Sequence, residues 1–316
     1  MTTRVLAVVG PTGTGKSAVA VELAARLGGE VVNADSMQLY RSMDIGTAKL
    51  SVDERAGIPH HLLDVWDVTE AADVVRYQQQ ARACIDEIAS RGRVPVLVGG
   101  SGLYVRAVLD DLDFPGTDPE VRGRLEAELI DLGPAALHAR LAAVDPAAAA
   151  AILPSNGRRL VRALEVVAIR GSFTATLPPP SPIYDAFQLA LDRPDLDDRL
   201  RRRVRQMFEG GLVDEVRRLE CIGLREGRTA SRALGYAQVL RARDAVARGA
   251  ELGSELARAE ADTVTATRRF ARRQRSWFRR DASVRWLTAL NSSDEFMSEA
   301  VTTMEQWWNV SPPRRS

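Results

Sequence analysis

The chain has 316 residues, of which 45% are hydrophobic and 27% are charged, and its formal net charge is +1 at pH 7. This length fits one large domain or two ordinary ones, with enough apolar content to bury a core. No apolar run approaches the ~18 residues of a membrane span. No charged-then-apolar leader precedes the first predicted strand, so we expect a soluble, cytoplasmic protein that does not bind membranes.

Cysteine and histidine usage excludes further classes of protein. Cys84 and Cys221 match neither a disulfide framework nor a zinc-site spacing, so both are predicted to be small buried side chains. His60, His61 and His138 form no ligand cluster in the sequence. The sequence therefore predicts neither a disulfide scaffold nor a zinc site.

Residues 10–17 fit the phosphate-loop pattern G-x-x-x-x-G-K-[ST] without a mismatch. The apolar run 5–9 is typical of a buried parallel strand, and residues 17–27 have helical spacing. Backbone N–H groups of such a loop and the positive end of the following helix bind phosphate. We expect Lys16 to reach the terminal phosphates and Ser17 to ligate Mg²⁺. The predicted loop residues are Gly10, Pro11, Thr12, Gly13, Thr14, Gly15, Lys16 and Ser17.

A carboxylate follows the second predicted strand, residues 30–35. In doubly wound sheets ligands bind beyond the carboxyl ends of the strands, which places Asp35 beside the phosphate loop. The loop at 36–40 offers hydrogen-bonding groups for a second substrate. Asp35 is predicted to be a general base, while a loop cap and a Mg²⁺ ligand remain open as alternatives.

The most strand-like run, residues 94–101, ends in Gly-Gly-Ser instead of the acid that many phosphate-loop NTPases place there. This ending weakens an ATPase or kinase interpretation and is compatible with diphosphate as a leaving group. Gly99 and Gly100 would permit close approach of a ligand, and Ser101 offers a hydroxyl.

The region from 114 to 184 contains several residue pairs that are typical of helix starts and ends, and it contains no long strand-like run. Asp118-Pro119 opens a helix that Gly133-Pro134 closes, and Asp145-Pro146 and Ser155-Asn156 begin two more. The predicted fold is α/β, a phosphate-loop NTPase-like parallel sheet flanked by helices, with an all-helical insertion. We expect the core at 1–113 and 185–290, the insertion at 114–184 and a C-terminal tail at 291–316.

Arginines within this insertion form a candidate phosphate-binding cluster. Arg122 lies in its first helix, and Arg158, Arg159 and Arg162 fall on neighbouring faces of a later one. Pairing of these arginines with Glu165 is the alternative.

Residues 187–191 are predicted to return to the sheet as a strand, and the chain from Asp195 onward is predicted to be helical. Arg199 and Arg203 lie four residues apart, so they share one helix face and could clamp a diphosphate if that helix covers the loop. The Gly235-Tyr236 turn offers a ring for stacking.

The small net charge hides an uneven distribution. Residues 199–280 contain 21 basic and 10 acidic side chains, and residues 266–280 contain seven arginines and no acid. Arginines interleaved with aromatic side chains are typical of an RNA-binding surface, although solvated helices remain an alternative. Phe270 and Trp277 are seven residues apart and are predicted to be core anchors. The predicted RNA contacts of this helix are Arg268, Arg269, Arg272 and Arg273.

Together these segments resemble the bacterial type of the tRNA dimethylallyltransferase family, from about Val5 to Trp286. The resemblance rests on residues 10–17 (GPTGTGKS), 33–40 (NADSMQLY), 43–49 (MDIGTAK), 59–61 (PHH), 98–104 (VGGSGLY), 118–122 (DPEVR), 156–165, 235–236 (GY) and the arginine-rich segment. Ser17 and Ser101 stand where relatives usually have Thr, and both keep the hydroxyl. The zinc finger of some eukaryotic relatives is missing.

The resemblance implies a reaction. The loop would hold dimethylallyl diphosphate with Mg²⁺, and the dimethylallyl group would pass to N6 of adenosine 37 in tRNAs that read codons beginning with U. The products would be N6-(dimethylallyl)adenosine and diphosphate. The implied catalytic residues are Asp35, Ser101 and Lys16, with Asp35 also a candidate Mg²⁺ ligand beside Ser17. The implied tRNA contacts are Asp35, Ser36, Met37, Gln38, Ser101, Arg122, Arg158, Arg159, Leu160, Val161 and Arg162.

Three alternatives stay open. An adenylate isopentenyltransferase acting on free AMP, ADP or ATP would share the loop and the chemistry but would have little use for the insertion. A phosphate-loop kinase would turn over ATP. A non-catalytic RNA-binding protein would use only the basic face. We expect a monomer that binds the anticodon stem-loop.

Overall fold

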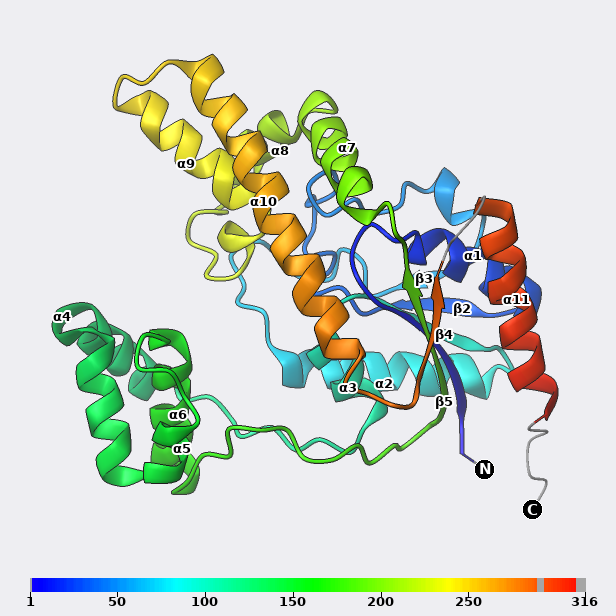
Figure 1. Ribbon diagram of the computed structural model, residues 1–316, viewed down its shortest axis with the longest axis horizontal. Coiled ribbons are helices and arrows are strands. Elements are labelled where there is room, and N and C mark those ends of the chain that lie inside the picture. The colour runs from blue at the N-terminus through cyan, green and yellow to red at the C-terminus, as the bar shows by residue number, and fades with distance from the viewer. Residues whose placement is uncertain (1, 289–292, 311–316) are drawn as a thin grey trace. The chain divides into compact units, whose positions relative to one another are not determined.

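The computed structural model describes residues 2–288 and 293–310, with side chains described over 2–288 and 297–308. The chain forms two compact units, Met1–Asp110 with Pro182–Ser316, and Asp111–Ser181 (Figure 1). The second unit is the helical segment between two parts of the α/β unit. Its boundaries lie three residues before the predicted 114 and 184.

A six-stranded parallel sheet forms the centre of the larger unit, in the order β3-β2-β4-β1-β5-β6. The strands are β1 Arg4–Val9, β2 Glu30–Asn33, β3 His60–His61, β4 Pro95–Val98, β5 Asp185–Asp192 and β6 Val284–Thr288. Strand β1 pairs with β4 through Leu6 and Val96 and with β5 through Val8 and Leu189. Alternate residues of β1 enter different apolar clusters, one on each face of the sheet. The predicted parallel α/β fold is confirmed.

Strand β6 was not expected, because residues 195–290 were predicted to be helical. Its sequence is Val-Arg-Trp-Leu-Thr, in which Val284 and Leu287 are buried in the apolar clusters on opposite faces of the sheet. It pairs in parallel with β5, from Gln188 with Val284 to Asp192 with Thr288. The prediction is wrong here because a five-residue strand at a sheet edge gains its stability from the neighbouring strand.

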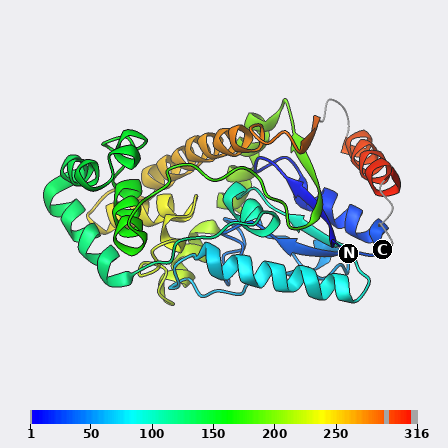
Figure 2. The same cartoon turned by 90° about the horizontal axis from the view of Figure 1, so that it is seen from below.

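Helices cover both faces of the sheet. Residues of α1 and α11 pack in the apolar cluster that contains Leu6 and Val8, and residues of α2, α3, α8, α9 and α10 pack in the cluster that contains Val5 and Ala7. Helices α9 and α10 form a hairpin, drawn in yellow and orange in Figure 2. The helices are α1 Lys16–Leu27, α2 Val74–Ser90, α3 Gly102–Leu109, α7 Leu196–Glu209, α8 Leu212–Glu220, α9 Tyr236–Ala247, α10 Leu252–Phe278 and α11 Ser293–Val310, with 3₁₀ turns at Asp53–Arg55 and Ala230–Arg232. None of the described helices is long and apolar enough to cross a membrane.

The segment predicted as a C-terminal tail contains helix α11. The Trp307 ring stacks on Phe187 of β5 at 5.1 Å between centroids, and the Arg4 guanidinium lies 4.6 Å from Trp307 and 4.7 Å from Trp308. These contacts make α11 part of the α/β unit. Residues 291–292 and 311–316 of the predicted tail lie outside the described residues. Cys221 is exposed and Cys84 is half-buried, so the prediction that both cysteines are buried is wrong for Cys221 and met only in part for Cys84.

The smaller unit is helical, with α4 Pro119–Val144, α5 Pro146–Ala150 and α6 Gly157–Arg170. Asp118 accepts from the N–H groups of Glu120 and Val121, and Asn156 accepts from the N–H of Arg159, as their N-cap positions predict. Gly133 has φ of 78° and interrupts α4 where the Gly133-Pro134 pair predicted a break.

A buried carboxylate connects the helices of this unit. Glu165 has no exposed surface, and its oxygens accept from the Arg122 and Arg162 side chains and from the N–H of Asp118. Burial alone would raise the pKa of Glu165, but hydrogen bonds from Arg122 and Arg162 outweigh it, and the pKa lies below the ordinary value.

Replacing Glu165 with Gln tests this interaction. We expect Glu165→Gln to lower the free energy of unfolding at pH 7 by about 2 kcal/mol, because charge-assisted hydrogen bonds are lost. Since the folded pKa of Glu165 is depressed, its stabilisation is present above the unfolded pKa and is lost as pH falls through the folded value. Urea unfolding across pH should therefore show the two proteins converging in acid; a constant difference would contradict the assignment.

Candidate active site

The phosphate loop lies between β1 and α1, and α7 covers it. Gly13 has φ of +85°, and a Cβ on this residue would stand 2.6 Å from Leu200 Cδ2 of α7. A side chain at position 13 would therefore strain the backbone and displace the Leu200 side chain. The predicted condition for a diphosphate clamp, that the helix carrying Arg199 and Arg203 covers the loop, is met.

Lys16 begins α1 and turns back over the loop. Its Nζ donates to Pro11 O at 2.7 Å, and the Thr14 hydroxyl donates to the same oxygen at 3.0 Å. Loss of solvent lowers the pKa of Lys16 to about 7, Asp35 opposes this change, and Arg203 adds to it. Because the charged form of Lys16 is poorly solvated here, an anion bound beside it would stabilise that form strongly.

Two arginines of α7 extend the cationic site. Arg199 Nε donates to Gly13 O at 3.2 Å, and Arg203 donates to Thr12 Oγ1 at 3.3 Å. Burial lowers the pKa of Arg203 from its usual value, and Asp35 partly offsets this. Both guanidinium groups therefore contact the loop that the sequence assigns to phosphate.

Asp35 lies two residues beyond β2, at the carboxyl edge of the sheet. Its N–H donates to Asn33 Oδ1, and its own Oδ1 accepts from the N–H of Met37, both at 2.9 Å. The loop-cap alternative therefore describes one oxygen of this carboxylate. Among the described residues, nothing donates to Asp35 Oδ2, which remains available to a ligand.

A cavity of about 380 Å³ joins these groups. Its other walls include Gly99, His60 and several apolar side chains. Burial lowers the pKa of His60, to which the sequence assigned no chemistry. The predicted site residues with side chains on this cavity are Thr12, Lys16, Ser17, Asp35, Gln38, Arg199 and Arg203.

One backbone oxygen links two parts of the cavity. Thr47 O accepts from Gln38 Nε2 at 3.2 Å and from Arg203 at 3.4 Å. Gln38 belongs to the loop after Asp35, and Arg203 belongs to the helix over the phosphate loop. The 43–49 segment therefore fixes both side chains in relation to each other.

Glu215 of α8 holds this segment and was missed by the sequence analysis. Its buried carboxylate accepts from the N–H groups of Asp44, Ile45 and Gly46 and from the Tyr236 hydroxyl at 2.5 Å. Tyr236 is fully buried, so the prediction that its ring is free for stacking is wrong. Nothing in the local pattern around position 215 distinguishes this acid from its exposed neighbours.

Ser101 acts on the loop that follows Asp35. Its hydroxyl accepts from the N–H of Ser36 at 3.3 Å and lies 3.4 Å from the Ser36 hydroxyl. Met37 packs against the apolar cluster of the sheet. Ser36, Met37 and Ser101 are absent from the cavity wall, while Asp35 and Gln38 form part of it.

Helix α10 presents arginines to solvent. Arg269 and Arg273 are exposed, and the Arg273 guanidinium lies 5.8 Å from the Phe270 ring. Arg268 and Arg272 share Asp197 of α7 at 3.8 and 3.6 Å. Trp277 packs against the apolar cluster that contains Val5 and Ala7, as its predicted role as an anchor requires.

The arginines predicted to bind RNA in the smaller unit fall into two groups. Arg122 and Arg162 pair with Glu165, which is the alternative that the sequence left open. Arg158 and Arg159 are exposed. The side chains of Leu160 and Val161 are buried in the core of the unit, so the prediction that these two side chains contact RNA is not supported.

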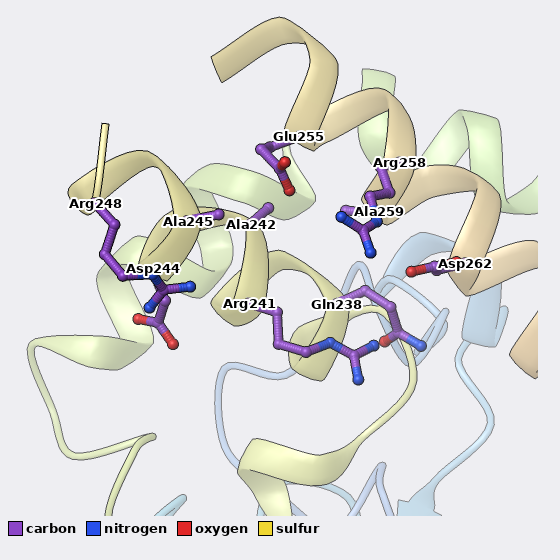
Figure 3. Close-up of a pocket in the computed structure, with 10 residues that line it drawn as sticks. All are labelled: Gln238, Arg241, Ala242, Asp244, Ala245, Arg248, Glu255, Arg258, Ala259 and Asp262. Carbon is purple, nitrogen blue, oxygen red and sulfur yellow. The ribbon is translucent and has the colours of Figure 1, made fainter. Parts of the chain in front are cut away.

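A second cavity, of about 360 Å³, lies between α9 and α10 (Figure 3). Arg241, Arg248 and Arg258 on its wall are balanced by Asp244, Glu255 and Asp262. It has no excess of charge and no phosphate loop. The reactive groups identified above therefore belong to the first cavity.

The family of this chain is shown by its similarity to known proteins. The family model described as IPP transferase matches residues 38–281. The chain belongs to this family. Proteins named tRNA dimethylallyltransferase from Streptomyces avermitilis and from a Parafrankia species are 66% and 64% identical over 288 and 283 residues, covering 90% of this chain and 90% and 87% of theirs.

Solved structures with names typical of this family also resemble the chain. The tRNA isopentenylpyrophosphate transferase of Bacillus halodurans is 39% identical, with a TM-score of 0.68 and 97% of each chain covered. A eukaryotic dimethylallyltransferase described as acting on tRNA is 25% identical, with a TM-score of 0.80, covering 99% of this chain and 81% of its own. The resemblance found in the sequence is confirmed.

The low pKa of Lys16 predicts proton uptake when an anion binds. At pH 8 the free site holds mostly neutral lysine, and a bound alkyl diphosphate should raise the pKa, so about one proton enters per site. At pH 6 the lysine is already charged and the uptake should nearly vanish. Calorimetry in buffers of different ionisation enthalpy measures this proton count. Lys16→Arg is the control, because its charge does not titrate; equal uptake by both proteins would contradict the assignment.

Proposed function

We propose that this enzyme transfers the dimethylallyl group of dimethylallyl diphosphate to N6 of adenosine 37 in tRNA, releasing diphosphate. The observation that carries the proposal is one cavity lined by the phosphate-loop lysine, the Arg199 and Arg203 pair and the Asp35 carboxylate. Three cations suit a diphosphate leaving group, and a carboxylate suits a nucleophile that must lose a proton.

The cationic wall binds and stabilises the leaving group. Lys16 and the loop N–H groups would grip the terminal phosphate, while Arg199 and Arg203 would approach from α7. As the allylic C–O bond breaks, negative charge gathers on the diphosphate and positive charge spreads over the five-carbon unit. Because these cations already contact the loop, little reorganisation is needed when that charge develops.

The donor set fits Mg²⁺ bound mainly through the substrate. Ser17 and Asp35 line one cavity, and the described residues contain no cluster of three His, Cys, Asp or Glu that could hold a metal alone. Mg²⁺ commonly uses one or two protein oxygens together with substrate phosphates and water. When bound, it would neutralise part of the diphosphate charge.

Asp35 would accept the proton of the attacking amine. Adenine N6 is a weak nucleophile because its lone pair is delocalised into the ring, so the proton must leave as the new C–N bond forms. Oδ1 is held by the N–H of Met37, which fixes the carboxylate and leaves Oδ2 to face the substrate. A flipped-out adenine could be positioned by Gln38, while Ser101 holds the same loop at Ser36.

RNA contacts outside the cavity would come from arginines. Arg268, Arg269, Arg272 and Arg273 of α10, together with Arg158 and Arg159 of the insertion, offer cations for a tRNA backbone. Arg122 and Arg162 would act with Glu165 as partner. The cytoplasmic location, the monomeric state and the choice of tRNAs remain predictions.

The decisive experiment incubates the protein with unmodified tRNA, dimethylallyl diphosphate and Mg²⁺, followed by nucleoside mass analysis. We expect an isopentenyl mass gain on one adenosine. Asp35→Asn should keep an acceptor for the N–H of Met37 but lower kcat by roughly 10²–10⁴-fold, because the proton acceptor is lost. Asp67→Asn, a change at an exposed acid paired with Arg41, is the matched control and should retain activity.

The other outcomes separate the alternatives. Prenylation of free AMP without tRNA modification would indicate an adenylate isopentenyltransferase. Phosphate transfer from ATP would indicate a kinase, and tight RNA binding without any product would indicate a non-catalytic protein.

The basic face of α10 gives a separate prediction. Arg269→Ala with Arg273→Ala should weaken tRNA binding and reduce the slope of log affinity against log salt by about 1 for each lost phosphate contact. Arg217→Ala with Arg218→Ala on α8 removes the same charge from two exposed sites and should have a smaller effect. Fluorescence anisotropy across a salt series measures both; equal slopes for the two double variants would refute the assignment.

A further inference from the structure

Gln274 is a buried amide within the arginine-rich part of α10. Its side chain is 5% exposed, whereas Arg272 and Arg273 beside it face solvent. Its Oε1 accepts from the N–H of Thr12 at 2.9 Å, and its Nε2 donates to Gly100 O at 2.8 Å. One side chain of α10 therefore contacts both the phosphate loop and the end of β4.

The bond to Thr12 fixes a peptide group that Lys16 also uses. The N–H of Thr12 and the oxygen of Pro11 belong to one planar peptide, so holding the N–H fixes the direction of the C=O. That oxygen accepts from Lys16 Nζ and from the Thr14 hydroxyl. Rotation of this peptide would move the acceptor that holds the ammonium.

The absence of a side chain at Gly100 makes room for Gln274. A Cβ on Gly100 would stand 2.2 Å from Gln274 Nε2. The sequence predicted that Gly99 and Gly100 permit close approach of a ligand; at Gly100 the approaching group is the amide of the protein itself. Gln274 therefore has a site shaped for it on two segments of the cavity.

We propose that Gln274 is a positioning residue for the diphosphate site, orienting the Pro11–Thr12 peptide and through it the ammonium group of Lys16. This inference rests on the proposed function, in which the loop holds the diphosphate. Gln274 does not line the cavity and acts only through the loop. Among the described residues the N–H of Thr12 has no other acceptor, so no other protein group orients this peptide when the amide is removed.

The inference predicts that substitutions at two adjacent residues, Gln274 and Arg273, lower two different affinities, one for diphosphate and one for RNA. Loss of the amide leaves the exposed arginines of α10 in place, so RNA binding should persist while the loop loses its orientation. Loss of Arg273 should do the reverse. A merely structural role for Gln274 would weaken both affinities together with the fold.

The test compares Gln274→Met with Arg273→Met in the full chain. Titration calorimetry with inorganic diphosphate and Mg²⁺ measures the affinity of the phosphate loop for diphosphate. Fluorescence anisotropy with an anticodon stem-loop RNA measures the affinity of the basic face of α10 for RNA. We expect Gln274→Met to weaken diphosphate binding about tenfold or more, as for two lost hydrogen bonds, and to change RNA affinity less than twofold. We expect Arg273→Met to weaken RNA binding and to leave diphosphate binding within twofold.

Gly100→Ala approaches the same contact from the other side, since its methyl group takes the place of the amide. It should weaken diphosphate binding. The double variant with Gln274→Met should bind diphosphate with about the same affinity as whichever single variant binds it less tightly. Additive losses, an unchanged diphosphate affinity in either folded variant, or parallel loss of both affinities would overturn the proposal. If Gln274→Met does not fold, Gly100→Ala alone decides between these results.

Measuring diphosphate binding by the wild-type protein also distinguishes a failure of this inference from a failure of the proposed function. A wild-type protein that binds diphosphate but transfers no prenyl group to tRNA would refute the function and leave the role of Gln274 to be decided by the same variants. A wild-type protein that binds no diphosphate would refute both.

Discussion

The arrangement of the site depends on one electrostatic constraint, an ammonium group held out of bulk water without a carboxylate bonded to it. Lys16 rests on the oxygen of Pro11, with Arg203 close enough to lower its pKa and Asp35 close enough to oppose that change. Such a site is costly while empty, because like charges meet where solvent screens them poorly. A diphosphate bound there, as proposed, would relieve this cost. The neighbouring elements hold the cations in place in its absence.

Two buried side chains supply that support from helices that carry no phosphate-loop residue. Glu215 of α8 gathers the N–H groups of residues 44–46, and this segment presents Thr47 O to Gln38 and Arg203. Gln274 of α10 holds the loop at Thr12. In each case a buried side chain has its hydrogen bonds satisfied by backbone groups, which fixes the geometry more firmly than packing alone. Hydrogen bonds from α8 and α10 thus support the groups on either side of the cavity.

The smaller unit follows the same physical rule in a separate core. Its charged centre is Glu165, whose burial is sustained by Arg122 and Arg162 and by the N–H of Asp118. The pairing with Glu165 that the sequence left open as an alternative is therefore observed for these two arginines. Their side chains are 31% and 30% exposed, so the same residues that stabilise the unit remain accessible to a polyanion.

Local patterns in the sequence determined the phosphate loop, the parallel strands before and after it, the caps of the inserted helices and the position of Asp35 at a strand end. Each depends on neighbours within a few residues, where backbone preference and hydrophobic period decide the outcome. Only the tertiary structure decided that β6 joins the sheet, that Tyr236 is buried, and that Glu215 and Gln274 support the site. These features join residues far apart along the chain, and the energy that selects them comes from partners that no local pattern reveals.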